Sequence, residues 1–86
     1  MDYRIFSVFD VALGAYGRPM FLQSKGQAVR SFSDEVNRRA DDNQMNRHPE
    51  DFQLFDLGSF SEDTGLFLTI APERIALAAD LIIEES

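Results

Sequence analysis

The sequence predicts an α+β domain in which a small antiparallel sheet of three or four strands packs two helices on one face. Three observations predict it. Aromatic and β-branched runs indicate strands early and late in the chain, helical spacing of apolar residues begins after Ser24, and a short acidic turn ending in Gly65 separates two late strands. The expected order is β, a short optional β, α, β, β, α. The 86 residues are expected to form one domain, residues 1–86.

The first strand is expected over residues 3–9, which are mostly aromatic or β-branched. Because side chains alternate along a strand, Tyr3, Ile5 and Phe9 share one face. Phe6 and Val8 share the other face. Both faces of this strand are therefore partly apolar.

Residues 10–18 are expected to form a loop, since they contain Gly14 and Gly17. Residues 19–22 follow as a short edge strand. Pro19 favours the edge of a sheet because proline has no N–H to donate within a central ladder.

A helix is expected from Ser24, which stands three residues before Gln27 in the spacing of a capping box. Apolar residues then recur at helical spacing and form one stripe. The stripe contains Ala28, Val29, Phe32 and Val36. The helix is expected to fade over residues 40–43, whose Asp and Asn side chains compete for backbone hydrogen bonds.

A polar loop over residues 41–51 leads to a strand at residues 52–60. Strict alternation places Phe52, Leu54 and Phe60 on one face of this strand. Phe55 and Leu57 lie on the other face. A turn over residues 61–65, with Gly65 at positive φ, leads to a return strand at residues 66–70.

The second helix is expected to begin at Pro72, because proline suits the first position of a helix. Apolar residues between 75 and 82 give it a broad apolar face. Residues 84–86 are expected to form a frayed tail.

The charge is acidic overall and uneven. The net charge is −7, with +1 over residues 1–47 and −8 over residues 48–86. Such a balance repels phosphate and favours a basic partner for the second half. The alternative is that the charges only keep a small protein soluble. Without cysteine, a signal sequence or an apolar run of membrane-spanning length, the chain is expected in the cytoplasm, with no membrane partner.

No pattern in the sequence predicts an enzyme. The single histidine, His48, stands beside a proline in a polar loop, and no serine lies in a nucleophile elbow. The acidic pairs lack the alternating ligand pattern of a calcium loop. We therefore expect no catalytic residue, no metal site and no cofactor.

Nucleic-acid binding is a second possibility. Basic side chains converge only near the end of the first helix and the loop after it. This candidate phosphate site consists of Arg38, Arg39, Arg47 and His48. The alternative is that these residues only complement the negative end of the helix dipole.

An uncovered sheet face is also expected, because two helices cover only one face of a sheet. A homo-oligomer through this face or the adjoining edge is predicted. The expected interface holds Phe6, Val8, Phe55, Leu57 and Phe67, or else the opposite set. The rings of Phe55 and Phe67 are alternatively a stacking platform for single-stranded nucleic acid. Nearby Asp56, Glu62 and Asp63 argue against that alternative.

The order and spacing of several segments resemble the small nonstructural protein of the gokushoviruses, single-stranded DNA bacteriophages of the Microviridae. The resemblance begins with Ser7-Val8-Phe9-Asp10 and includes residues 28–37. It is strongest at His48-Pro49-Glu50-Asp51-Phe52 and Leu54-Phe55-Asp56-Leu57-Gly58, and it ends at the Thr64-Gly65 turn.

Proteins of this family are described as nonstructural or DNA-binding and are compared with microvirus packaging protein C. The resemblance implies a non-enzymatic role in genome packaging or replication switching in the host cytoplasm. The implied partners are the phage replication complex or procapsid proteins. The acidic balance favours protein contacts with weak DNA contact, and the alternative is a direct single-stranded DNA-binding protein.

Overall fold

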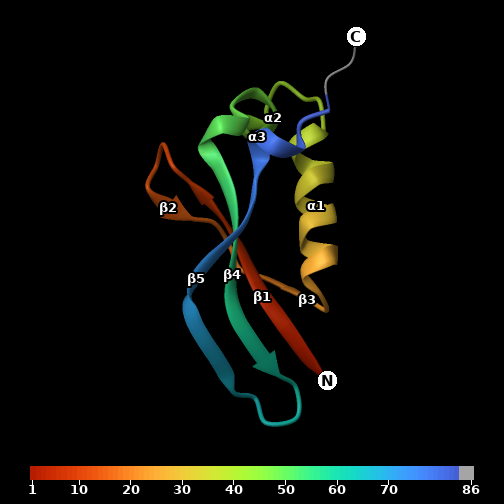
Figure 1. The fold of residues 1–86 in the computed structure, drawn as a ribbon, viewed down its shortest axis with the longest axis vertical. Helices are drawn as coiled ribbons and strands as arrows, with labels where there is room; N and C mark the ends of the chain where they lie inside the picture. Colours follow the sequence, from red (N-terminus) through yellow and green to blue (C-terminus); the bar gives the residue numbers. More distant parts are fainter. Residues whose placement is uncertain (84–86) are drawn as a thin grey trace.

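The computed structural model describes residues 1–83, and the tail expected at residues 84–86 lies outside them. An antiparallel five-stranded sheet carries α1 on one face, which confirms the predicted α+β class (Figure 1). The molecule is elongated, 48 × 25 × 20 Å. Its elements are β1 (Asp2–Asp10), β2 (Ala15–Tyr16), β3 (Met20–Leu22), α1 (Lys25–Asn37), α2 (Gln44–Arg47), the 3-10 turn η1 (Pro49–Asp51), β4 (Phe52–Ser61), β5 (Phe67–Leu77) and α3 (Ala78–Leu81).

Strand β1 is central. It pairs with β4 along one side, while β2 and β3 share its other side, and β5 pairs with β4 at the far end of the sheet. The predicted loop at residues 10–18 therefore contains a short strand. The Asp10 carboxylate accepts hydrogen bonds from the amides of Ala12 and Leu13, and Gly14 takes a φ of 69°. This tight turn returns the chain so that Tyr16 pairs with Phe9.

Helix α1 confirms the predicted cap and stripe. The Ser24 hydroxyl accepts from the Gln27 amide at 3.2 Å, and the Gln27 side chain accepts from the Gln23 amide at 3.0 Å. The first bond satisfies a donor that a helix start leaves open, and the second ties the residue before the cap to the first turn. The buried face consists of Ala28, Phe32 and Val36. The helix ends at Asn37, three residues before the expected fading segment.

A β-bulge in β4 changes the expected faces of that strand. Ile5 pairs with Gly58 and Phe6 pairs with Asp56, so Leu57 has no partner on β1. One extra residue reverses the alternation beyond it. Phe60 therefore lies on the same face as Phe55, whereas strict alternation had placed the two on opposite faces.

The prediction of a second helix from Pro72 is wrong, because β5 continues through it to Leu77. Gly58 pairs with Thr69 and Asp56 pairs with Glu73, so residues 70–72 bulge out of the ladder. An edge strand with a bulge tolerates proline, since no ladder bond is lost there. The helix is reduced to the four residues of α3.

The core lies between α1 and the adjacent face of the sheet. It consists of Phe6, Ala28, Phe32, Val36, Leu54 and Ala78, with Val8 among the residues packed against it. Phe6 thus belongs to the core and Val8 packs against it, so neither lies on the uncovered sheet face through which oligomerisation was predicted. The reason is that α1 covers the face of β1 that carries them, and Phe6 is completely buried.

Candidate functional site

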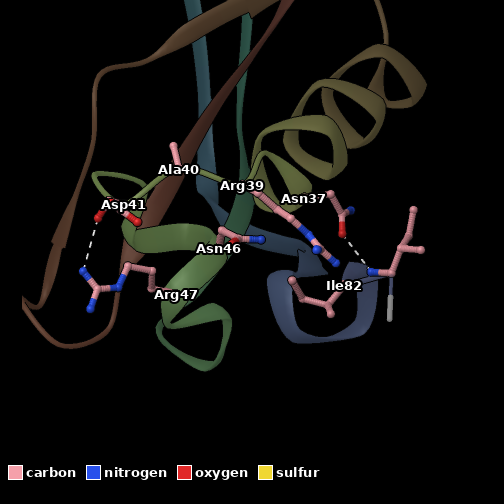
Figure 2. Close-up of a pocket in the computed structure, with 8 residues that line it drawn as sticks. Asn37, Arg39, Ala40, Asp41, Asn46, Arg47 and Ile82 are labelled. Atoms are coloured by element: carbon pink, nitrogen blue, oxygen red, sulfur yellow. Dashed lines mark hydrogen bonds between the residues drawn. The ribbon is translucent and has the colours of Figure 1, made fainter. Parts of the chain in front are cut away.

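The first candidate is an open pocket where α1 ends. Arg39 and Arg47 line it together with Asn37, Ala40, Asp41, Asn46, Ile82 and Ile83. Arg47 donates to the Asp41 carbonyl at 3.2 Å, while the Arg39 side chain extends toward Ile82 at the other end (Figure 2). Two of the four predicted phosphate-binding residues therefore share one pocket, but their guanidinium groups point toward its opposite ends.

Asn37 lines this pocket, and its side chain holds two chain segments together there. Its amide nitrogen donates to the carbonyls of Ser33 and Leu81 at 2.8 and 2.9 Å, and its oxygen accepts from the Ile83 amide at 2.7 Å. These bonds join the end of α1 to the end of α3. The sequence offered no signal for this role, since it depends on chain segments 44 residues apart.

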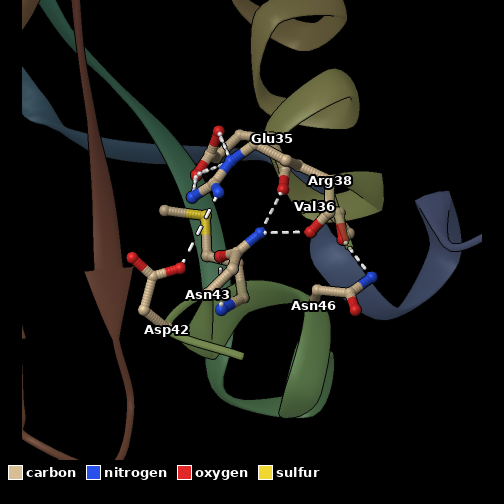
Figure 3. Close-up of polar contacts among 7 residues, drawn as sticks. Glu35, Val36, Arg38, Asp42, Asn43 and Asn46 are labelled. Atoms are coloured by element: carbon tan, nitrogen blue, oxygen red, sulfur yellow. Dashed lines mark hydrogen bonds and ion pairs between the residues drawn. The ribbon is translucent and has the colours of Figure 1, made fainter. Parts of the chain in front are cut away.

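The other predicted basic residues lie outside this pocket's lining. Arg38 forms a forked contact with Glu35, whose closest N–O distance is 2.8 Å, and lies 3.8 Å from Asp42 (Figure 3). The Arg38 guanidinium holds the pKa of Glu35 below its usual value, and Glu35 raises the pKa of Arg38. His48 lies 3.7 Å from Glu50. A phosphate that approached Arg38 or His48 would therefore meet the negative charge of Glu35 or Glu50.

Two asparagines close the end of α1 beside Arg38. Asn43 donates to the carbonyls of Glu35 and Arg38 at 2.8 Å each, and Asn46 donates to the Val36 carbonyl at 3.0 Å (Figure 3). The Glu35 carbonyl also accepts from the Arg38 backbone amide at 3.2 Å, whereas the Val36 and Arg38 carbonyls lie at a helix end, where intrahelical donors run out. The segment after α1 is therefore built to terminate the helix, and side-chain amides do this without a basic residue in its last turn.

The second candidate is the sheet face away from α1. Phe9, Tyr16 and Phe55 form one group, the upper aromatic cluster, with ring centroids 4.7–6.0 Å apart. The register places all three on the side of β1 opposite Phe6 and Val8. The contacts are tilted or edge-to-face, which are favourable arrangements for aromatic rings.

A second group, the hairpin aromatic cluster, lies on the same face nearer the β4–β5 turn. It consists of Phe21, Phe60 and Phe67, with centroids 5.0–6.2 Å apart. Phe60 pairs with Phe67 across β4 and β5, and Phe21 pairs with Ile5 across β3 and β1. Six of the ten aromatic side chains thus form these two clusters on the face without α1, and Tyr3, which pairs with Phe60, lies on the same face. Phe60 joins them only because of the bulge at Leu57.

Of the predicted interface residues, Phe55 and Phe67 lie on this aromatic face, and Leu57 sits half-buried in the bulge. Charge on the face is sparse. Arg74 pairs with Phe55 across β4 and β5. Near the hairpin cluster, the Glu62 carboxylate raises the pKa of the Tyr3 hydroxyl.

Comparison with known proteins gives one result. A model of the family described as "Phage ORF5 protein" matches residues 3–81. The chain belongs to the phage ORF5 protein family. The match includes both aromatic clusters and most of the helix-end pocket, so the features described above lie largely within the family's own domain. No curated protein and no solved structure matches the chain.

Within residues 1–83, no helix has the length and apolar character that crossing a membrane requires. In the same part of the chain, no three histidine, aspartate or glutamate side chains gather as metal ligands would.

Proposed function

We propose that this phage ORF5 family protein is a non-enzymatic nonstructural protein that promotes genome packaging, or the switch from replication to packaging, through protein contacts. The observation that carries the proposal is the aromatic face on a chain with a net charge of −7. The resemblance to the gokushovirus protein supplies the biological setting, a single-stranded DNA phage of the Microviridae in its host's cytoplasm.

The aromatic face supports protein contacts. Aromatic side chains are enriched in the cores of protein interfaces, where they bury much surface with few rotatable bonds. Tyr16, Phe21 and Phe67 remain 44%, 45% and 58% exposed although they contact neighbouring rings. A partner that covers this face would remove those rings from water.

The electrostatics support a protein partner over DNA. Residues 48–86 carry a net −8, and of the four predicted phosphate-binding residues, Arg38 and His48 lie beside carboxylates. Phosphate binding depends on cations whose charge is available to the nucleic acid. The proposed partners are therefore basic surfaces of the phage replication complex or procapsid.

Affinity capture of defined phage proteins tests this proposal. The immobilised chain is incubated with purified replication initiator and procapsid proteins of the same phage, after nuclease treatment. We expect retention of at least one of them, and loss of retention when Tyr16→Ser and Phe21→Ser are combined, since neither residue lies on β5. Leu13→Ser is the matched control, because Leu13 is 79% exposed but lies in the β1–β2 turn. Retention that survives the double change would contradict a role for the aromatic face.

The alternative is direct binding of single-stranded DNA. One observation favours it, the contact of the exposed Tyr16 ring with Phe55, which pairs with Arg74, since bases stack on aromatic side chains of a sheet. Oligonucleotide titrations at several salt concentrations separate the two functions. Tight binding with a steep salt slope at physiological salt would support the alternative, and weak binding would support the adaptor role.

A further inference from the structure

The outer side of β5 is an open sheet edge. Strand β5 ends the sheet order β2-β1-β4-β5, and within residues 1–83 no strand pairs with its outer side. Its first eight residues are exposed. Figure 1 shows the β4–β5 hairpin extending well beyond the start of α1, so no helix covers this part. An open edge presents backbone N–H and C=O groups to any other strand.

This edge is apolar on both faces of the sheet. Phe67 and Leu68 are consecutive and therefore point to opposite faces, and they are 58% and 70% exposed. Leu66 and Ile70 are also exposed. A partner packed on one face would cover only one of the two consecutive side chains. A strand added along the edge brings neighbours to both, because cross-strand pairs form on each face.

The charges favour a second copy of this chain as the occupant. Residues 64–72 contain no charged residue, although residues 48–86 as a whole carry −8. A basic partner would find no carboxylate there to recognise. Two copies, each with a net charge of −7, meet at this edge without placing like charges opposite each other. An antiparallel strand edge is also complementary to itself about a two-fold axis.

We propose that two copies of the chain pair edge to edge, with residues 67–69 of the two β5 strands antiparallel and the two Leu68 residues opposite each other. The bulge at residues 70–72 and the missing N–H of Pro72 end the pairing. The proposal is independent of the packaging role, since it concerns only how two copies associate. An edge this short buries less than the roughly 800 Å² per partner of a standard interface, so we expect a Kd in the micromolar range.

Sedimentation equilibrium tests the proposal on the full chain. The wild-type mass should rise with concentration from 9.8 kDa toward twice that value. Leu68→Lys should raise the Kd about tenfold or more, because the two-fold axis brings the two ammonium groups close together. Leu13→Lys is the control, since Leu13 is even more exposed but lies in the β1–β2 turn. Its Kd should equal that of the wild type.

Cross-linking gives a second measurement that does not depend on charge. The chain has no cysteine, so Leu68→Cys and Leu13→Cys each provide a single thiol. A short bismaleimide should link two copies of the Leu68→Cys variant much faster than two copies of the Leu13→Cys variant. A monomeric wild-type mass at about 200 µM, a Kd unchanged by Leu68→Lys, or equal cross-linking of the two variants would overturn the proposal. Circular dichroism verifies that each variant is folded.

Discussion

Replacing Gly58 with alanine tests the bulge that organises the aromatic face. Gly58 has a φ of 131°, and a Cβ there would collide with the Leu68 carbonyl oxygen and lie 3.0 Å from the Thr69 Cα. The disfavoured φ alone costs about 1–3 kcal/mol. The collision is with backbone of the paired strand, so relief requires β4 and β5 to separate locally. We expect Gly58→Ala to lower the free energy of unfolding by about 3 kcal/mol or more, combining strain with lost packing.

Gly65→Ala is the matched control, measured by urea denaturation under the same conditions. Gly65 also has a positive φ, 73°, but no atom lies within 4 Å of the position of its Cβ. That change should cost only the left-handed backbone penalty, about 1–2 kcal/mol. The difference between the two variants isolates the collision with β5. A loss for Gly58→Ala no larger than that for Gly65→Ala would refute the close approach of the two strands at the bulge.

Three further predictions concern the core, the ion pair and the pocket. Phe32→Ala should lower the free energy of unfolding by about 3–5 kcal/mol, because the ring is buried, and an almost unchanged urea midpoint would contradict its core position. Because Arg38 lowers the pKa of Glu35, the ion pair stabilises the fold above pH 4.5, and this stabilisation is lost as the pH falls through the lowered pKa. In the Arg38→Gln variant, the Glu35 pKa measured by NMR titration should return toward 4.5. Any oligonucleotide binding should be weak at physiological salt and should fall when Arg39→Ala and Arg47→Ala are combined, whereas Arg38→Ala alone should change it little.

The sequence was sufficient to predict those elements whose structure depends on residues close together in the chain. The Ser24 cap, the stripe of Ala28, Phe32 and Val36, and the turn ending in Gly65 depend on residues within about one helical turn or one hairpin loop. The interactions that stabilise the cap and the turn are made between residues close together in the chain. The α+β class follows from the order of these elements, so composition and periodicity were enough to predict it.

Proline at position 72 shows where local rules are insufficient. The same apolar residues after it suit a helix or a strand, and proline is favourable at a helix start. The outcome depends on β4, which leaves residues 70–72 in a bulge at the sheet edge. Only the pairing partner, distant in the sequence, selects the strand.

The candidate sites divide in the same way. The sequence indicated by itself that basic residues converge near the end of the first helix and that one face of the sheet is left uncovered by helices. Only the tertiary structure placed Arg38 against Glu35, away from the pocket that Arg39 and Arg47 line, and placed Phe6 under α1. One unpaired residue, Leu57, reverses the side-chain alternation of β4 and brings Phe55 and Phe60 to one face. Alternation within a strand is local, but the register that interrupts it is fixed by pairing between strands, and a single chain segment does not contain that information.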